Sequence, residues 1–476
     1  MLEIFNNLFV ALHANNVIFC NWKGHYAVET NLAGDGDLDL FIPLNSKEEF
    51  EKIAKREGFK RVISFQANHD FIEHYYGLDK STLKFVHIHA YFKIVTGEHV
   101  SKNYTLPLEE YLLSNLDSSS LLPTINAIGR QNIFLVRYFL KIGSLYGLLQ
   151  YWREIEKYSK EWNSYNHENE YESILELDLS REDLCEMSKV YESSSFFKKI
   201  LLSLRLKKRF KSFKRRSYLK LQIYIVVNFI IRLINRFFLK KKKMLTYGYV
   251  IAICGLDGSG KSSLVSALGE NYSRHFCTKV FHLGRPASNA LTFIFNQIVA
   301  IYSRLRRIKI AHKEGNLVKS AKNISIIYAI RSVLLAYDRK VQANKAHRLS
   351  QKGYLVICDR YPGLAIGKMD SPRIPFNRSR GRLYQSCYIL EQKLYKLIKP
   401  ANLIFQLSVP LNVAIDRNNK REKADKETED ELRERFLLNS DAKFLAEDCI
   451  GVDATVSFKE VLLQVSNKVW LSGNGK

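Results

Sequence analysis

The sequence predicts a two-domain α/β protein whose C-terminal half contains a parallel sheet wrapped by helices. From about Met244 onward, apolar strand-like runs alternate with amphipathic helical runs, which is the pattern of successive βαβ units. Before this, a mixed α/β region reaches about Val100, and a mostly helical stretch runs from about Leu106 to Lys189. A chain of 476 residues is also too long for one ordinary hydrophobic core.

A strongly basic stretch separates the two halves. Between Ser193 and Lys243 there are 17 Lys or Arg and no acid, which is about two thirds of the formal net charge of +25. Such a charge predicts an anionic partner. We therefore predict four parts: an α/β domain over 1–104, a helical extension over 105–192, a basic linker helix over 193–245 and a second α/β domain over 246–476.

The end of the basic stretch predicts an amphipathic helix. In LQIYIVVNFIIRLINRFFLKKKK, from Leu221 to Lys243, one helical stripe carries Asn228, Arg232, Arg236 and Lys240. A transmembrane span needs about 20 apolar residues, and the two arginines argue against one. The pattern fits a helix lying on an anionic membrane surface. It equally fits a solvated linker helix whose apolar face packs on a neighbouring domain.

The strongest motif is YVIAICGLDGSGKSS, which predicts a phosphate-binding loop. An apolar strand runs into Gly255, Gly260, Lys261 and Ser262, and a helical run follows. Glycines let backbone N–H groups close around phosphate oxygens, and the helix N-terminus adds positive potential. We expect Lys261 to neutralise the β and γ phosphates of ATP. The alternative is a glycine-rich loop that has lost its nucleotide. The candidate ATP-binding residues are Gly255, Asp257, Gly258, Ser259, Gly260, Lys261, Ser262 and Ser263.

A carboxylate at the end of a second buried strand completes a candidate magnesium site. YLVICDRY places Asp359 after a run of apolar or aromatic residues. We expect Asp359 and Ser262 to hold Mg²⁺ with the nucleotide. The alternative is that Asp359 only forms a salt bridge with Arg360.

These motifs together resemble the thymidylate kinase family. The resemblance rests on GLDGSGKSS, FHLGRP, LLAYDRKVQANKAHRL, VICDRY and PANLIFQLSVPLNVAIDR, and it spans roughly Tyr249 to Phe436. It implies a nucleoside-monophosphate-kinase-like parallel sheet and phosphoryl transfer from ATP. It also implies site roles. Residues facing the acceptor would be Arg285, Arg339 and Arg360, with Asp257 near its sugar, and Arg417 and Arg421 would be lid arginines that clamp the transferring phosphoryl group.

Two departures from that family put thymidylate itself in doubt as the acceptor. After the Asp-Arg-Tyr of the second strand, the chain continues PGLAIGKMDSPRIP in place of the Ser/Ala-Tyr-Gln run that shapes a thymine pocket. A basic insertion, SRLRRIKIAHKEGNLVKSAKN, also stands where the kinase would cover its acceptor. The charge of this insertion fits a phosphorylated or polyanionic acceptor, and it equally fits a solvated basic loop. We expect a phosphorylated nucleotide, sugar or glycan as acceptor.

The N-terminal half carries a second constellation, in VIFCNWKGHYAVETNLAGDGDLDLFI. Gly24 precedes Asp37 and Asp39, and strand alternation puts both carboxylates on one face, where they could share magnesium ions. On the later strand KFVHIHAYF, His87 and His89 stand where a third acid would be expected. They fit metal ligands or phosphate partners, or polar positions of a half-buried strand. The pattern is that of the nucleotidyltransferase fold; the alternative is a surface turn in which Asp35 and Asp37 end a helix and start a strand.

The pairing of these two domains resembles proteins encoded in bacterial capsule and lipopolysaccharide gene clusters. The resemblance implies a cytoplasmic kinase in surface-polysaccharide biosynthesis, with ATP and Mg²⁺ as cofactors and a possible homodimer left open. A start without a cationic segment or small-residue cleavage site fits the cytoplasm, and the basic helix could hold the chain at the inner face of the membrane. A membrane-bound, nucleotide-gated scaffold is the alternative. Nucleic acid ranks last as a partner because no base-stacking or groove-reading module is recognisable.

Overall fold

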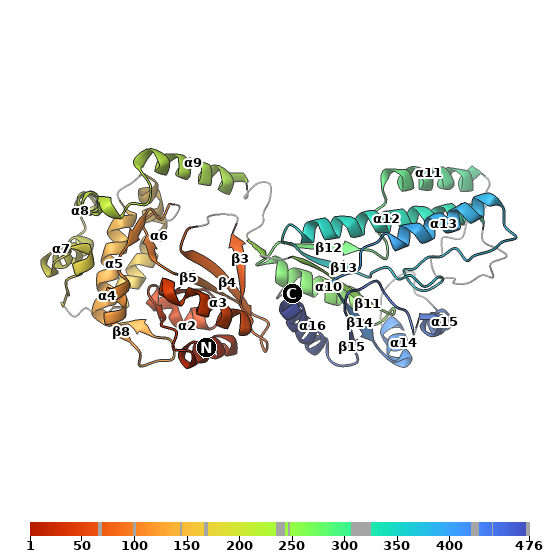
Figure 1. Ribbon diagram of the computed structural model, residues 1–476, viewed down its shortest axis with the longest axis horizontal. Coiled ribbons are helices and arrows are strands. Elements are labelled where there is room, and N and C mark those ends of the chain that lie inside the picture. Colours follow the sequence, from red (N-terminus) through yellow and green to blue (C-terminus); the bar gives the residue numbers. More distant parts are fainter. Residues whose placement is uncertain are drawn as a thin grey trace. The chain divides into compact units, whose positions relative to one another are not determined.

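The chain divides into two compact units, Met1–Thr246 and Tyr247–Lys476, each with its own sheet (Figure 1). The computed structural model describes residues 1–64, 69–98, 101–142, 145–165, 170–234, 243–245, 248–305, 325–419, 428–439 and 441–472. The predicted α/β class with a parallel sheet in the C-terminal half is confirmed. The helical extension and the described part of the basic segment belong to the first compact unit.

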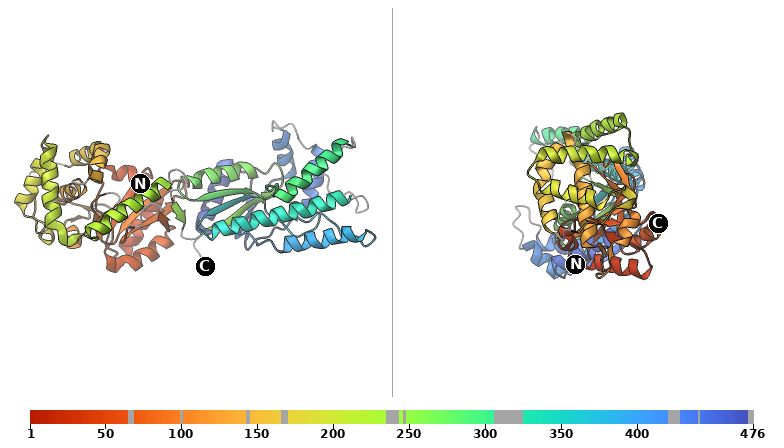
Figure 2. Two further views of the ribbon diagram at one scale, coloured as in Figure 1. Left: turned by 90° about the horizontal axis from the view of Figure 1, so that it is seen from above. Right: turned by 90° about the vertical axis from the view of Figure 1, so that its left-hand side faces the viewer.

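A mixed sheet forms the centre of the first unit, and Figure 2 shows it from two further directions. Among the described residues its strand order is β10-β3-β4-β5-β2-β1-β9-β8, with β2 and β5 parallel and β4 antiparallel to β5. The strands are β1 (Cys20–Asn21), β2 (Asp37–Phe41), β3 (Lys60–Ser64), β4 (Ile72–Leu78), β5 (Phe85–Tyr91), β8 (Leu116–Asp117), β9 (Thr124–Ile125) and β10 (Lys243–Leu245). A separate pair is formed by β6 (Ile94–Thr96) and β7 (Tyr104–Leu106).

Strand alternation separates the core of this unit from its polar cluster. Leu38 and Leu40 of β2 and Ile88 of β5 are fully buried and pack with apolar residues of α1 (Glu3–Ala14) and α3 (Lys47–Arg56). Because successive side chains point to opposite faces, the residues between them lie together on the other face. That face therefore receives the aspartates and histidines predicted from the sequence.

Helices make up most of the rest of the first unit. α5 (Ala127–Lys141) is buried along most of its length, and the side chain of its N-cap residue Asn126 accepts a hydrogen bond from the Gly129 N–H at 2.7 Å. The remaining helices are α2 (Val28–Leu32), α4 (Glu109–Ser114), α5 (Ala127–Lys141), α6 (Leu145–Asn163), α7 (Arg181–Glu192), α8 (Phe196–Arg209) and α9 (Tyr218–Ile234), with short 3₁₀ turns at His25–Ala27, Leu44–Ser46, Leu175–Leu177 and Phe210–Phe213.

α9 covers the described N-terminal part of the predicted amphipathic helix, and within its polar stripe the side chain that the structure describes is that of Asn228. Asn228 is buried at 6% exposure, whereas Ile223 and Phe229 are 65% and 60% exposed. Arg236 and Lys240 lie outside the described residues, as does the side chain of Arg232. The predicted helix was extended to Lys243, but Lys243 begins β10, which pairs with β3. None of the helices within the described ranges is long and apolar enough to cross a membrane.

The second unit contains a sheet whose described strands all run parallel. Their order is β12-β13-β11-β14-β15, with β11 in the centre. The chain therefore moves to one side of β11 and later to the other, which makes the carboxyl end of β11 a topological switch point, where α/β sheets bind ligands. The strands are β11 (Tyr249–Gly255), β12 (Thr278–His282), β13 (Leu355–Asp359), β14 (Leu403–Ser408) and β15 (Cys449–Asp453).

Helices cover both faces of the parallel sheet (Figure 1). Val250 and Ala252 of β11 pack with Ala336 and Ala343 of α12 and with Tyr395 of α13. On the other face α10 contacts β12 and β13, and it also packs on α16. The helices are α10 (Lys261–Ser273), α11 (Ala290–Leu305), α12 (Ile326–Ser350), α13 (Arg382–Lys396), α14 (Leu411–Asn419), α15 (Glu429–Asn439) and α16 (Phe458–Ser472).

Candidate functional site

A tight loop joins β11 to the N-terminus of α10. Gly255 and Gly260 have φ angles of 146° and 89°, a region that residues with a side chain rarely adopt. A Cβ at Gly255 would also stand 2.5 Å from the Leu407 carbonyl oxygen of β14. Gly258 and Ser259 are buried within the loop. The loop thus has the glycine-dependent backbone and the position before a helix N-terminus that an anion-binding loop requires.

Lys261 lies inside this loop with 5% of its side chain exposed. Its Nζ donates to the Leu256 carbonyl oxygen at 2.6 Å and stands 3.4 Å from Asp257 Oδ1. Burial lowers the pKa of Lys261 from its ordinary value, although the neighbouring Asp257 carboxylate acts in the opposite direction. The ammonium is therefore held at the loop by oxygen acceptors.

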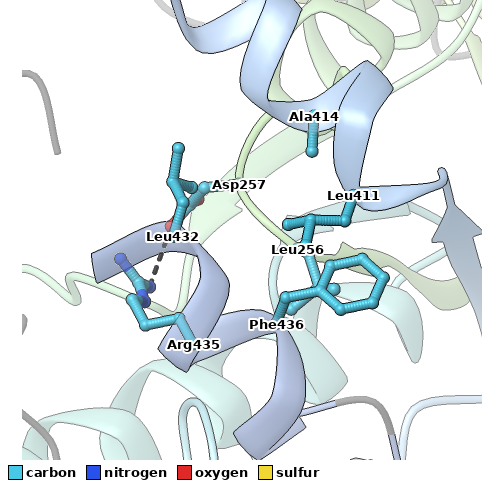
Figure 3. Close-up of a pocket in the computed structure, with 7 residues that line it drawn as sticks. All are labelled: Leu256, Asp257, Leu411, Ala414, Leu432, Arg435 and Phe436. Carbon is cyan, nitrogen blue, oxygen red and sulfur yellow. Dashed lines mark ion pairs between the residues drawn. The ribbon is translucent and has the colours of Figure 1, made fainter. Parts of the chain in front are cut away.

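Asp257 is the anion around which three cations gather. Its carboxylate is 2.7 Å from Arg360 Nη2, 2.8 Å from Arg435 Nη2 and 3.4 Å from Lys261 Nζ. Figure 3 shows the pair that Arg435 of α15 forms with Asp257. Burial raises the pKa of this carboxyl, but the three cations outweigh burial and hold the pKa well below its usual range.

Ser262 and Asp359 meet at the carboxyl ends of β11 and β13. Ser262 Oγ donates to Asp359 Oδ2 at 3.2 Å, and Asp359 is 7% exposed. The other carboxylate oxygen, Oδ1, is buried and has no hydrogen-bond partner among the described residues. A hydroxyl beside a buried carboxylate oxygen of this kind fits Mg²⁺, which prefers oxygen ligands. Ser263 is exposed on the next position of α10.

Arg360 forms ion pairs with carboxylates other than Asp359. Its guanidinium pairs with Asp257 and, at 3.5 Å, with Asp370 Oδ2. Arg339 of α12 is fully buried and donates to Asp370 Oδ1 at 2.9 Å and to the Leu283 carbonyl at 3.0 Å. The sequence predicted that Arg339 contacts an acceptor directly. In the fold its guanidinium is buried and donates to Asp370 and to the Leu283 carbonyl instead. Arg339 positions Asp370, and Asp370 in turn positions Arg360.

The described arginines among the remaining predicted ones form hydrogen bonds outside the loop. Arg285 is exposed after β12, and its backbone N–H donates to His282 Nδ1 at 3.2 Å. Arg417 of α14 donates to the Ala454 carbonyl at 2.9 Å, which ties it to the end of β15. Arg421 lies outside the described residues. Among the described residues that follow β14, Arg435 of α15 is an arginine that contacts the loop, through Asp257.

Arg435 also borders a shallow depression beside the loop. Its walls are apolar apart from the Asp257–Arg435 pair, and they come from the loop, α14 and α15 (Figure 3). The lining residues are Leu256, Asp257, Leu411, Ala414, Leu432, Arg435 and Phe436. Sequence reasoning missed Arg435 because a single arginine in a charged helix carries no local signal; only the fold brings it to Asp257.

The polar cluster of the first unit pairs the predicted aspartates with histidines. β2 and β5 align Asp37 with His87 and Asp39 with His89. The His87 Nδ1 to Asp37 Oδ1 distance is 2.6 Å, and the His89 Nδ1 to Asp39 Oδ1 distance is 3.2 Å. Lys23 Nζ stands 3.1 Å from Asp39. Burial raises the pKa of Asp39, but Lys23 and His89 outweigh it and bring the pKa well below the usual range.

The site of the second unit is that of a P-loop α/β protein, and its similarities to known proteins are remote. No family model matches the chain. Over 226 residues it is 25% identical to "Uncharacterized ATP-binding protein YghR" of Escherichia coli K12, covering 47% of this chain and 87% of that protein. It is 33% identical over 129 residues to "Uncharacterized ATP-binding protein YghS" of the same strain, covering 26% of this chain and 53% of the relative.

Two solved structures show weak likeness to about half of the chain. Thymidylate kinase from Candida albicans has a TM-score of 0.28 at 17% identity, covering 47% of this chain and 94% of its own. Deoxyadenosine kinase from M. mycoides with bound dATP has a TM-score of 0.26 at 15% identity, covering 46% and 98%.

We predict that Asp257→Asn destabilises the second unit by about 1–3 kcal/mol at neutral pH, because it removes the carboxylate that three partly buried cations share. The folded-state pKa of Asp257 lies below that of the unfolded chain, about 4. The stability that ionised Asp257 adds to the folded state is therefore present above about pH 4, and it is lost as the pH falls through the folded-state pKa. Hydrogen exchange of the β11 amides at several pH values measures the difference.

The matched control is Asp441→Asn, which removes a surface pair with Lys368 whose carboxylate is 72% exposed. We expect this variant to change the free energy of opening, measured from exchange of the β11 amides, by less than about 1 kcal/mol. Equal exchange rates in Asp257→Asn and the wild type at pH 7 would contradict the compensating role of Asp257.

Proposed function

We propose that the second unit is an ATP-dependent phosphotransferase. The observation that carries this proposal is the loop itself, in which Lys261 is buried among oxygen acceptors next to the Ser262–Asp359 pair. The names of the two E. coli relatives, which describe ATP binding, support a nucleotide as ligand.

The residues divide between binding the nucleotide and stabilising transferring charge. The loop amides and Lys261 would bind the β and γ phosphates, while Ser262 and Asp359 would hold Mg²⁺, which supplies charge neutralisation. The bond between the γ phosphorus and the β–γ bridging oxygen breaks, an acceptor oxygen forms the new P–O bond, and ADP leaves. Arg435 and Arg360 lie where they can share the spread negative charge of the moving phosphoryl group.

The acceptor side of the site is cationic and held rigidly. Arg360 has a φ of 69° and is anchored through Asp370 to the buried Arg339, so its guanidinium has a fixed direction. Arg285 is exposed in the loop after β12. These charges favour an acceptor that already bears phosphate, and we propose a phosphorylated nucleotide, sugar or glycan. The resemblance to proteins of surface-polysaccharide gene clusters supports the last two.

The experiment is turnover of ATP by the purified chain against a panel of nucleoside monophosphates and phosphorylated sugars. Lys261→Ala should lower kcat/KM on the accepted substrate by about 100-fold or more, because transition-state charge loses a fixed cation. Arg435→Ala should lower kcat by about 10-fold or more for the same reason. Unchanged turnover in Lys261→Ala would contradict the proposal.

Arg433→Ala is the matched control on the same helix. Arg433 pairs with Glu429 on the exposed side of α15, away from Asp257. Its loss removes the same side chain and charge without touching the loop. We expect its turnover to stay within about twofold of the wild type.

A specific observation supports a second role at an anionic membrane surface. α9 exposes apolar residues along its outer side, including Ile223 and Phe229, and Lys220 beside them is exposed. A contiguous apolar surface with flanking cations suits the boundary of an anionic bilayer. We propose that α9 holds the chain at such a surface as a peripheral protein.

Flotation with vesicles containing phosphatidylglycerol tests this role. The wild type should float at low salt, and Ile223→Glu with Phe229→Glu should reduce the floated fraction several-fold, since two charges would enter the apolar layer. The control, Leu175→Glu with Leu437→Glu, replaces two leucines that are 83% and 75% exposed elsewhere in the chain. If both double variants float equally well, or if the wild type does not float at all, α9 is excluded as the anchor.

A further inference from the structure

Three histidines meet on one face of the sheet in the first unit. The antiparallel register of β4 and β5 sets His74 opposite His89, and His87 lies two residues before His89 on the same strand. One ligand atom from each of the three lies within 4.8 Å of the other two. His74 Nδ1 and His87 Nε2 are 3.1 Å apart. His74 lies on a strand to which the sequence pattern gave no site residue.

The two aspartates of β2 lie next to the two histidines of β5. Asp37 lies 2.6 Å from His87 Nδ1, and Asp39 lies 3.2 Å from His89 Nδ1. A carboxylate accepts a hydrogen bond, so each of these Nδ1 atoms carries the proton and each Nε2 keeps its lone pair. His87 Nε2 faces His74 Nδ1 at 3.1 Å, and His89 Nε2 lies 3.8 Å from Asp37 Oδ2. Carboxylates that accept the second N–H of an imidazole are the usual partners of histidine metal ligands. Asp39 is also paired with Lys23, which offsets its charge.

We propose that His74, His87 and His89 form a site for a divalent transition metal ion, with Zn²⁺ the natural occupant. Two nitrogens on one tetrahedral Zn²⁺ at about 2.0–2.1 Å lie about 3.3 Å apart, close to the 3.1 Å between His74 and His87. Imidazole nitrogens suit zinc and its neighbours, whereas Mg²⁺ requires oxygen ligands. Three nitrogens leave one tetrahedral position for an exchangeable ligand.

This assignment changes the role of the Asp-x-Asp pair. The sequence favoured direct magnesium ligation by Asp37 and Asp39, but in the fold both carboxylates are bound to histidines. They become positioning residues for His87 and His89. The site lies wholly within the first unit, so it does not depend on the proposed phosphotransferase activity of the second.

The test is a Co²⁺ titration of the full-length, untagged chain after treatment with a chelator, followed by visible absorption. Co²⁺ bound by three nitrogens in a tetrahedral site gives intense d–d bands, and Zn²⁺ should abolish them at one equivalent. His74→Ala should weaken Co²⁺ binding at least 100-fold. Asp37→Asn keeps all three histidines and should weaken it about 10–100-fold through loss of orientation.

The control and the contrary outcomes are defined by the same titration. His13→Ala removes an exposed histidine of the same unit that contacts the Leu121 carbonyl, and it should bind Co²⁺ like the wild type. Circular dichroism of each variant shows that it is folded. Absence of d–d bands in the wild type, bands of wild-type strength in both His74→Ala and Asp37→Asn, or displacement of Co²⁺ by equimolar Mg²⁺ would each overturn the proposal.

Discussion

The carboxylate of Asp257 is the constraint on which the site of the second unit depends. Lys261, Arg360 and Arg435 come from three different parts of the chain, and each approaches this one side chain within 3.4 Å. At an effective dielectric constant of about 20, two charges about 4 Å apart interact by about 4 kcal/mol. Without a shared anion, the three cations would repel each other. A phosphate group entering the loop would offer the same cations a larger negative charge.

The support around this centre reaches deep into the fold. Arg339, buried beneath the sheet end, fixes Asp370, and Asp370 fixes Arg360. The glycine backbone of the loop fixes Lys261, and the parallel strands β11 and β13 bring Ser262 to Asp359. The cationic groups are thus preorganised, which is what electrostatic stabilisation of a transferring phosphoryl group requires.

The sequence predicted those parts of the molecule that depend on neighbouring residues. The phosphate-binding loop, its strand and its helix are contiguous, so the pattern from Gly255 to Ser262 located them. Strand alternation also predicted that Asp37 and Asp39 share a face. Arg435 and His74 could not be found in this way, because each gains its meaning from a partner far away in the chain. Arg339 carried a family motif, yet burial turned its guanidinium inward, and burial is a property of the whole fold.

In both units, the position of the polar side chains follows from how the apolar core packs. In the first, alternation on β2 and β5 puts apolar side chains against α1 and α3 and leaves the opposite face to aspartates and histidines. In the second, the reversal of strand order around β11 opens the carboxyl end of the sheet. In each case the apolar residues that build the core also determine where the polar residues meet.

The central claim is that the second unit binds a nucleoside triphosphate at this loop. The most direct test is hydrogen exchange of the full chain with and without MgATP. Amides from Gly255 to Ser263 should exchange at least 10-fold more slowly at saturating MgATP, while those of β2 and β5 stay unchanged. Lys261→Ala should lose the protection at the same nucleotide concentration. Exchange in the loop that does not respond to MgATP in the wild-type chain would contradict the account.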